Sequence, residues 1–348
     1  MIGFQKSVNL FLVWIMILKR MNYDTPLMVE YGITPFCNAN CVFCLNYWQK
    51  NPFVFKESWE KTKKICDNII SADVFEVYLT GGEPTCSKFF DKIVKYFYNA
   101  GISVAVSTNG LNVTDDKLNS ILYYVDKIGI SLHSVFGAHD KIMNHPGAFN
   151  KVDGFLKKLD SVGYEYSLNY TTFLGNYANL DSTLEFVNKN YVGVSGFNIN
   201  RVSVVGKAFM DHIILPKSKQ IELFHKIKSL KNRYYFDVDL ADVGPYCFTK
   251  IKHKPCGAGF SFTYVDPWGN NQLCIMNNVS FGNLLETDLA KLWHNKEILK
   301  FRSLEWLPPK CKSCKSVSFC QGGCKFSQSE LKSGVPYSED ILLGDYLK

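Results

Sequence analysis

Apolar and polar positions follow two regular patterns along most of the chain. Six short runs are rich in apolar and β-branched residues, as buried strands are: 28–36, 74–80, 102–107, 127–133, 165–173 and 197–205. Five segments between them carry apolar residues at helical spacing: 57–71, 88–100, 114–124, 148–161 and 179–190. Repeated strand–helix units predict an α/β fold with a parallel sheet and helices packed on its outside.

The six units contain no second repeat, so we expect a partial (β/α)6 barrel similar to a TIM barrel. Beyond about residue 230 the chain changes to short turns, glycines and cysteines. We therefore expect an N-terminal extension over 1–27, the barrel over 28–230 and a smaller C-terminal cysteine-rich domain over 231–348.

Polar and glycine-rich motifs follow the first four predicted strands. Three cysteines within "CNANCVFC" (37–44) follow the first strand, and "GGEP" (81–84) follows the second. "STNG" (107–110) and "SLHS" (131–134) follow the third and the fourth. Because the carboxyl ends of parallel barrel strands meet at one end, we expect these motifs to form a single site.

Composition and charge exclude several classes of protein. Apolar residues make up 47% of the chain, which is too many for extensive disorder. The net charge of +7 comes from basic residues that are spread out, except for a short cluster at Lys250, Lys252 and Lys254. We interpret that cluster as a solvated surface, and we expect no nucleic-acid partner.

The apolar run at 9–18 is too short to span a bilayer and is followed by Lys19 and Arg20 without a small-residue cleavage site. It predicts either a packed or interfacial helix or sequence upstream of a start at Met21. We expect a cytoplasmic protein without a membrane span. Thiols stay reduced in the cytoplasm, so clustered cysteines there indicate metal binding rather than disulfides.

Two groups of cysteines have the spacing of metal ligands. Cys37, Cys41 and Cys44 form C-x3-C-x2-C, which supplies three thiolates where zinc and most iron–sulfur sites need four ligands. The segment 311–324 reads C-x2-C-x5-C-x3-C, and a glycine stands five positions before Cys274. A zinc knuckle is the alternative interpretation of the later group.

With these motifs the chain resembles the radical SAM enzymes that carry a C-terminal SPASM domain, over residues from about 28 to 325. The resemblance implies that Cys37, Cys41 and Cys44 bind a [4Fe–4S] cluster. The fourth iron is then left for S-adenosylmethionine. Phe43 matches the aromatic residue that commonly precedes the third cysteine.

The resemblance also implies a binding site for the cosubstrate. The stretch Gly81, Gly82, Glu83 and Pro84 matches the segment that receives the methionyl amino group. We expect Ser107, Asn109 and Ser131 to contact the ribose or the carboxylate. Many relatives carry an arginine where this chain has Met143 and Asn144, so Lys141 or Arg201 would have to bind the carboxylate, and Lys141 fits a solvated helix residue better.

In the SPASM resemblance the later cysteines hold two auxiliary clusters. Cys256, Cys274 and Cys324 match ligands of the first, and Cys311, Cys314 and Cys320 match ligands of the second. No cysteine follows Cys324, so the second cluster would use another ligand such as Asp340 or Asp345, keep an open iron, or be absent.

Three cysteines remain outside these sets. We assign Cys247 to the first auxiliary cluster, with a free thiol that donates a hydrogen atom to a substrate radical as the alternative. Cys66 lies on a predicted helix and is expected in the core. Cys86 is expected to be a packed loop residue.

The implied activity is that of a radical SAM oxidoreductase. S-adenosylmethionine is cleaved to a 5′-deoxyadenosyl radical, which removes hydrogen from a substrate carbon. We expect modification of a peptide or protein side chain by oxidation or crosslinking. The alternative is an epimerase or dehydrogenase acting on a peptide residue, a sugar or an antibiotic precursor, with a cysteine as hydrogen donor.

The expected partners follow from that chemistry. They are a peptide or small-molecule substrate and a reductant such as flavodoxin or ferredoxin. Only 36 residues precede Cys37, too few for the leader-binding domain of many peptide maturases. We therefore expect a separate leader-peptide recognition protein.

Overall fold

The structure is a computed structural model that describes residues 23–45, 55–252, 254–277, 279–327, 337–338 and 340–343. The apolar run at 9–18, Met21 and Asp345 lie outside these ranges. Among the described residues, no helix combines the length and the apolar character that crossing a membrane requires.

Nine strands form one open sheet in the order β7-β6-β5-β4-β3-β2-β1-β8-β9. All neighbouring strands are parallel except β8 and β9. The strands are β1 (Met28–Thr34), β2 (Glu76–Gly81), β3 (Ser103–Thr108), β4 (Lys127–Ser131), β5 (Tyr166–Thr172), β6 (Val194–Arg201), β7 (Asp237–Leu240), β8 (Phe262–Val265) and β9 (Asn271–Gln272). The prediction of six strands in a partial α/β barrel is confirmed.

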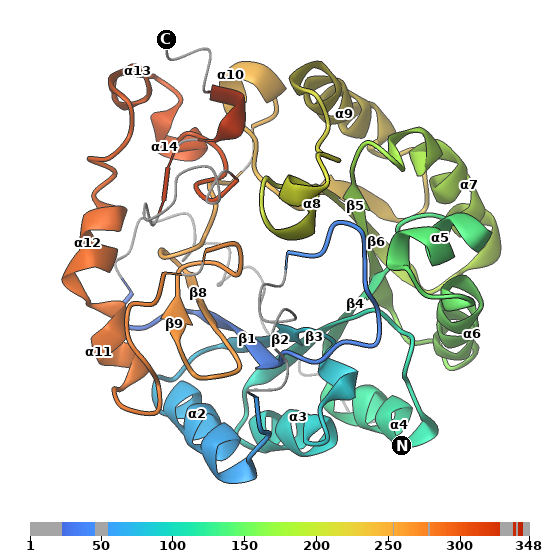
Figure 1. Cartoon of the computed structure of the whole chain (residues 1–348), viewed down its shortest axis with the longest axis horizontal. Coiled ribbons are helices and arrows are strands. Elements are labelled where there is room, and N and C mark those ends of the chain that lie inside the picture. Colours follow the sequence, from blue (N-terminus) through green and yellow to red (C-terminus); the bar gives the residue numbers. More distant parts are fainter. Residues whose placement is uncertain are drawn as a thin grey trace.

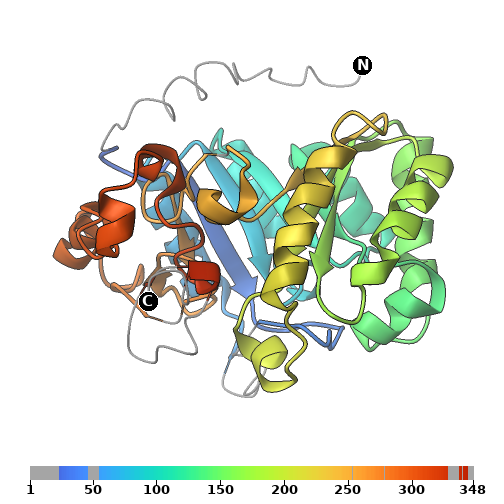
Figure 2. The same cartoon turned by 90° about the horizontal axis from the view of Figure 1, so that it is seen from above.

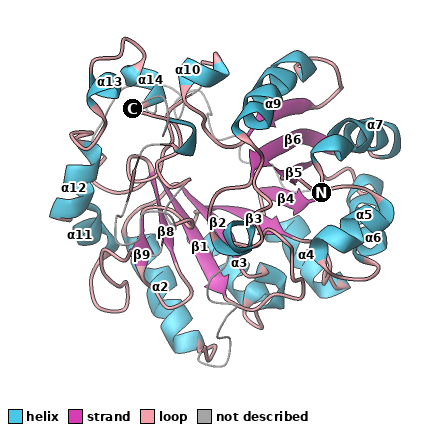
Figure 3. Ribbon diagram, turned by 45° about the horizontal axis from the view of Figure 1, so that its top comes forward, coloured by secondary structure: helices cyan, strands magenta, loops and turns pink. Residues whose placement is uncertain are grey.

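Helices cover the outer face of this sheet (Figures 1 and 3). Those around the barrel are α2 (Trp59–Ser71), α3 (Phe90–Asn99), α4 (Asp115–Tyr124), α5 (Phe136–Met143), α6 (Ala148–Ser161), α7 (Leu180–Asn190), α8 (Gly206–Met210) and α9 (Lys217–Leu230), with the short 3-10 helices η3 (Pro84–Cys86) and η4 (Tyr177–Asn179). The C-terminal region adds α10 (Tyr246–Thr249), α11 (Leu289–Trp293), α12 (Lys296–Arg302), α13 (Pro309–Lys312), α14 (Val317–Cys320) and η5 (Ile341–Leu343).

Helix α2 shows how local sequence sets these elements. The Ser58 side chain caps the helix by accepting a hydrogen bond from the Lys61 N–H at 3.5 Å. Ile65 and Ile69 lie one turn apart, and both they and the neighbouring Cys66 are almost completely buried. The expectation that Cys66 is a core residue is confirmed.

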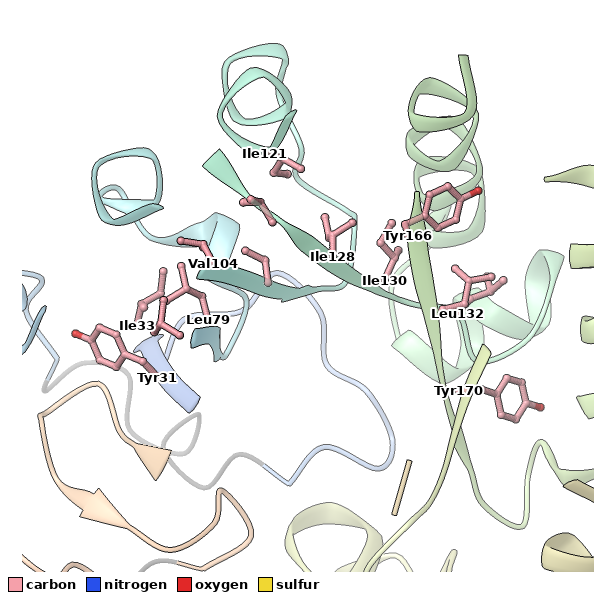
Figure 4. Packing of buried hydrophobic residues seen from close by; sticks show 14 of the residues in the cluster. Tyr31, Ile33, Leu79, Val104, Ile121, Ile128, Ile130, Leu132, Tyr166 and Tyr170 are labelled. Atoms are coloured by element: carbon pink, nitrogen blue, oxygen red, sulfur yellow. The ribbon is translucent and has the colours of Figure 1, made fainter. Parts of the chain in front are cut away.

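The main core lies between the sheet and its helices. In β1, Tyr31 and Ile33 are buried, and in β2 the same holds for Leu79 (Figure 4). Successive side chains of a strand point to opposite faces of the sheet. The half-buried Glu30 and Tyr78 therefore lie on the face away from the helices.

Residues beyond 230 extend the sheet at both edges. Strand β7 pairs with β6, whereas β8 pairs with β1, so the C-terminal region is attached to the first strand (Figure 2). That region also has a core of its own, which includes Leu273, Ile298, Phe301 and Phe326. The division of the chain at 230 stays a prediction, because one sheet runs through both parts.

Candidate functional site

The loop that follows β1 is held against the end of α5. The backbone N–H groups of Asn40 and Val42 donate to the carbonyl groups of Met143 and Ile142, each at 3.0 Å. The Cys41 Sγ lies 3.4 Å from the Met143 Sδ. Met143 is fully buried. Met143, which stands where many relatives carry an arginine, therefore anchors the cysteine loop.

The other end of this loop contacts the segment after β6. The Lys207 N–H donates to the Cys44 carbonyl at 3.0 Å. Gly206 has φ +58°, and a Cβ there would lie 2.4 Å from the same carbonyl oxygen. The Lys207 ammonium contacts the Asn40 side-chain oxygen, and its charge lowers the otherwise raised pKa of Cys41. The sequence analysis missed this cation because it lies more than 160 residues from the cysteines.

The three thiols of the loop influence one another electrostatically. The pKa of Cys37 is raised to about 12, mainly by burial and then by the charges of Glu83 and Cys44, against a hydrogen bond from the Ala39 N–H that lowers it. Burial also raises the pKa of Cys41, followed by the charges of Cys44 and Cys37. These neighbouring thiols are therefore disfavoured as thiolates unless a positive centre compensates for their charge.

The glycines after β2 let two loops meet closely. The Gly82 N–H donates to the Thr34 carbonyl, and the Glu83 N–H donates to the Phe36 carbonyl, both at 2.7 Å. A Cβ on Gly82 would lie 2.2 Å from the Phe36 oxygen, and Gly81 has φ +133°. Only glycines fit this contact. The stretch 81–84 therefore lies directly against the chain that leads into Cys37.

The Glu83 carboxylate is occupied by protein donors. Its Oε1 accepts from the Thr85 N–H at 3.0 Å, from the Thr85 hydroxyl at 2.6 Å and from the Thr108 hydroxyl at 2.7 Å. Its Oε2 accepts from the Asn109 N–H at 2.7 Å. A carboxylate has about four acceptor sites. In this arrangement Glu83 fixes the backbone of the loop, and its contact with the ammonium of the cosubstrate stays a prediction.

The ends of β3 and η3 reach the first cysteine. The Asn109 amide lies 2.7 Å from the Asn38 side-chain oxygen and 3.7 Å from the Cys37 Sγ. Burial raises the pKa of Cys86, followed by the charge of Glu83, against a hydrogen bond from the Asn38 N–H. The charge of Cys86 also raises the pKa of Cys37. Cys86 is thus half-buried beside the cysteine loop, at the end of the 3-10 helix η3 rather than in a loop.

The two serines that are predicted to contact the cosubstrate, Ser107 and Ser131, lie at or next to the last residue of their strands, β3 and β4. Ser107 forms a hydrogen bond with the Tyr78 hydroxyl. Ser131 ends β4 opposite Asn169 of β5. Both lie at the same end of the sheet as the cysteine loop, as the sequence analysis expected.

Phe43 packs against two aromatic rings that lie just after the ends of β4 and β5. Its ring centroid lies 4.7 Å from that of His133 and 5.6 Å from that of Phe173. Burial lowers the pKa of His133 well below its usual range and that of His139 to about 4. The Nδ1 atoms of these rings accept from the N–H groups of Thr171 and His133. Two neutral imidazoles therefore support the loop.

Arg201 does not offer a free guanidinium to a ligand. All five of its N–H directions are used: Nε donates to Asp242, Nη1 to Gln220 and Asp340, and Nη2 to Asp340 and to the Val243 carbonyl. The suggestion that Arg201 binds the cosubstrate carboxylate is corrected by this pairing. Lys141 is exposed on α5, as expected.

Cys256, Cys274 and Cys324 form one group inside the C-terminal core. Burial raises the pKa of Cys274 well above its usual range, and the charges of Cys256 and Cys324 contribute. Burial raises the pKa of Cys324 to about 12, followed by the charges of Asp340 and Cys256. Asp340 accepts a hydrogen bond from the Cys324 N–H at 2.9 Å. Because Asp340 is also paired with Arg201, it does not stand free as a ligand of the other group.

Cys311, Cys314 and Cys320 lie on or between α13 and α14, nearer the surface, with Cys314 exposed. Burial raises the pKa of Cys247, followed by the charges of Cys320 and Cys314. The assignment of Cys247 to the group of Cys256 stays a prediction, although the N–H of the preceding Tyr246 donates to the Sγ of Cys320, a member of the surface group, at 3.3 Å.

These groups fit iron–sulfur clusters by the chemistry of their donors. In the described part of the chain, no three His, Cys, Asp or Glu side chains converge as ligands of one metal ion do. A [4Fe–4S] cluster has a different requirement, since each thiolate binds its own iron. Each of the three groups provides neighbouring thiols of this kind.

Comparison with known proteins identifies the class. Residues 31–188 match the radical SAM superfamily, and residues 256–315 match an iron–sulfur cluster-binding domain, SPASM. The chain belongs to the radical SAM superfamily. Within it, the protein is one of the enzymes that add a SPASM domain, with a [4Fe–4S] cluster, S-adenosylmethionine and auxiliary iron–sulfur clusters as cofactors.

The relatives are distant but span most of the chain. The AdoMet-dependent heme synthase of Methanosarcina barkeri is 22% identical, covering 86% of this chain and 91% of its own. The mycofactocin maturase of Mycobacterium tuberculosis is 24% identical, covering 86% and 78%. The PqqA peptide cyclase of Granulibacter bethesdensis is 22% identical, covering 87% and 83%.

A solved structure has the same fold. Streptococcus suis SuiB bound to S-adenosylmethionine superposes with a TM-score of 0.73 at 18% identity, covering 95% of this chain and 80% of its own. When bound, the cluster and the cosubstrate supply an organic radical that removes hydrogen from carbon. The residues described above hold the loop, exclude water and keep the thiols together.

Proposed function

We propose that this enzyme oxidises or crosslinks a side chain of a peptide or protein. The observation that carries the proposal is the pairing of a radical SAM match with a SPASM match in one chain. One relative at 22% identity is named PqqA peptide cyclase, and another at 24% identity is named mycofactocin maturase. Auxiliary clusters beside the barrel suit an oxidation, because they can accept an electron from the substrate radical.

Other parts of the proposal concern partners and location. A reductant such as flavodoxin or ferredoxin would supply the low-potential electron. A separate protein would present the leader of the substrate peptide. We place the enzyme in the cytoplasm, where its thiols stay reduced for cluster binding.

A direct assay tests the reaction class. The reconstituted enzyme is incubated anaerobically with S-adenosylmethionine, a reductant and short peptides encoded near its gene. We expect 5′-deoxyadenosine together with a peptide that has lost a pair of hydrogen atoms, measured by mass spectrometry. Uncoupled cleavage with every peptide, and coupled turnover of a small molecule instead, would contradict the proposal.

A small-molecule substrate is the second candidate. One relative is named AdoMet-dependent heme synthase and another Fe-coproporphyrin III synthase, both at 22% identity. The same assay with iron porphyrins, sugars and antibiotic precursors decides between the two. In heavy water, an epimerase that uses a cysteine donor would place one solvent deuterium on its product, whereas oxidation or crosslinking would not require it.

We infer that Lys207 pairs with the carboxylate of S-adenosylmethionine. Arg201 is fully paired and Lys141 is exposed on α5, whereas Lys207 contacts Asn40 inside the cysteine loop. Its charge also acts on Cys41. A lysine can bind a carboxylate as a point charge. Gly81, Gly82 and Pro84 would line the site through their backbone, with Ser107, Asn109 and Ser131 at the neighbouring strand ends.

A further inference from the structure

The short helix α10 is docked on α14. The Tyr246 N–H donates to the Cys320 Sγ at 3.3 Å. The Tyr246 and Phe319 rings meet edge to face with centroids 5.0 Å apart. The Lys252 ammonium lies 5.5 Å from the centroid of the same Phe319 ring. Figure 1 shows α10 and α14 next to each other at the C-terminal side.

The backbones of these two segments also approach closely. A Cβ on Gly323 would lie 2.8 Å from both the N and the Cδ atoms of Pro245, and Gly323 has φ +81°. A glycine is therefore required where the chain between Cys320 and Cys324 passes Pro245. Since Pro245 is the N-cap of α10, this contact fixes the start of α10 relative to the segment that directly follows α14.

The half-buried thiol of Cys247 shares its surroundings with the surface group. Cys247 directly follows Tyr246, whose N–H donates to the Cys320 Sγ at 3.3 Å. Cys274 and Cys324, in contrast, belong to the buried C-terminal core, against which Cys256 packs. Cys247 thus lies with one group and apart from the other.

We propose that Cys247 is the fourth thiolate ligand of the auxiliary cluster held by Cys311, Cys314 and Cys320. It stands upstream of these three residues in the sequence. The cluster near the surface is then coordinated by cysteine alone. Among the described residues, Cys256, Cys274 and Cys324 then keep three thiolates for the buried cluster.

This assignment divides the roles of the two auxiliary clusters. A cluster with four thiolates has no iron open to a substrate, so the surface cluster transfers electrons. The buried cluster retains one iron without a thiolate from the described chain. The inference rests on the SPASM cofactors and not on the proposed substrate, so it survives if the peptide proposal fails.

The first test compares single and double variants of the full-length reconstituted enzyme. Iron per chain and the electron paramagnetic resonance of the reduced clusters are measured for Cys247→Ala, Cys314→Ala and Cys274→Ala. We expect Cys247→Ala to change the same signal as Cys314→Ala, and the double variant of these two to resemble Cys314→Ala. Adding Cys274→Ala should remove a second signal. Cys86→Ala, another half-buried cysteine outside the SPASM region, is the matched control.

The second test uses the wild-type enzyme alone, so it does not depend on whether a variant folds. The loaded wild-type enzyme is treated with iodoacetamide, and alkylated cysteines are mapped by mass spectrometry. We expect Cys247 to be protected together with Cys314 and Cys320, and to become reactive when the cluster is chelated. Rapid alkylation of Cys247 in fully loaded enzyme would overturn the proposal. A change of the Cys274 signal in Cys247→Ala would do the same.

Discussion

The cysteine loop after β1 and the cysteines of the C-terminal region are positioned in different ways. One loop of eight residues supplies Cys37, Cys41 and Cys44, and its backbone is pinned by hydrogen bonds to Met143 and Ile142. The C-terminal groups take their members from helices and loops, and Cys256 and Cys324 of one group lie 68 residues apart. Spacing alone therefore describes the first site, whereas the later sites depend on how the segments dock.

The two C-terminal groups also differ from each other in burial. Cys274 and Cys324 are buried in an apolar core, and a buried Arg201–Asp340 pair lies beside them. Cys314, by contrast, is exposed. Solvent exposure and hydrogen bonds to sulfur are among the factors that set a cluster's potential. Two clusters only a few residues apart in sequence are thus placed in unlike surroundings.

The largest expected effect follows from removing the first loop's ligands. The triple variant Cys37→Ala, Cys41→Ala, Cys44→Ala should lose cleavage of S-adenosylmethionine entirely. The reason is that these three thiols hold the cluster that binds the cosubstrate, and no other group of described residues can replace them. Much of the iron absorbance from the later cysteines should remain. Release of 5′-deoxyadenosine and iron content are measured together. Cys66→Ala, in the core, should still cleave, and cleavage by the triple variant would contradict the assignment.

Breaking the buried ion pair tests the docking of the C-terminal region. Arg201→Met leaves two buried carboxylates without their partner, which should lower the free energy of unfolding by about 3–5 kcal/mol. Since Asp340 also binds the Cys324 N–H, iron should be lost first from that cluster. Arg233→Met removes an exposed pair with Glu185 and should cost at most about 1 kcal/mol. Urea unfolding measures both variants. Equal decreases in their free energy of unfolding would show that the buried pair contributes no more to stability than the exposed pair.

Crowding the contact between the two loops tests the first site's geometry. Gly82→Ala places a Cβ 2.2 Å from the Phe36 oxygen, so we expect a loss of about 1–3 kcal/mol in unfolding free energy. Cosubstrate cleavage should fall with it, because the cysteine loop is displaced. Gly154→Ala, in helix α6 with open space around it, should instead gain about 0.5–1 kcal/mol. Unchanged cleavage of S-adenosylmethionine by Gly82→Ala would show that the position of this loop does not affect the reaction.

The smallest expected effect concerns the cation beside the cysteines. Lys207→Met should weaken binding of S-adenosylmethionine about tenfold, which corresponds to about 1.4 kcal/mol. Isothermal titration of the reconstituted protein measures the dissociation constant directly. Lys141→Met changes an exposed lysine on α5 and should leave the constant unchanged. The same affinity in both variants would exclude Lys207 as the carboxylate partner.

The sequence by itself determined the strand–helix order and the C-x3-C-x2-C site. The reason is that strand alternation, helical spacing and ligand spacing within one loop are local properties. Strands β1 to β6 lie where the apolar runs predicted them. Gly81 and Gly82 are a local feature of the same kind, because glycine lets two backbones approach closely.

Only the tertiary structure decided how distant polar groups are paired. The sequence left Arg201 available to a ligand, but the fold surrounds it with Asp242, Asp340 and Gln220. It suggested Cys256 as the neighbour of Cys247, nine residues away, but α10 docks on α14 and brings Cys247 to Cys320. Burial favours whichever partners satisfy a charge or a donor, and those partners are set by packing across the whole chain.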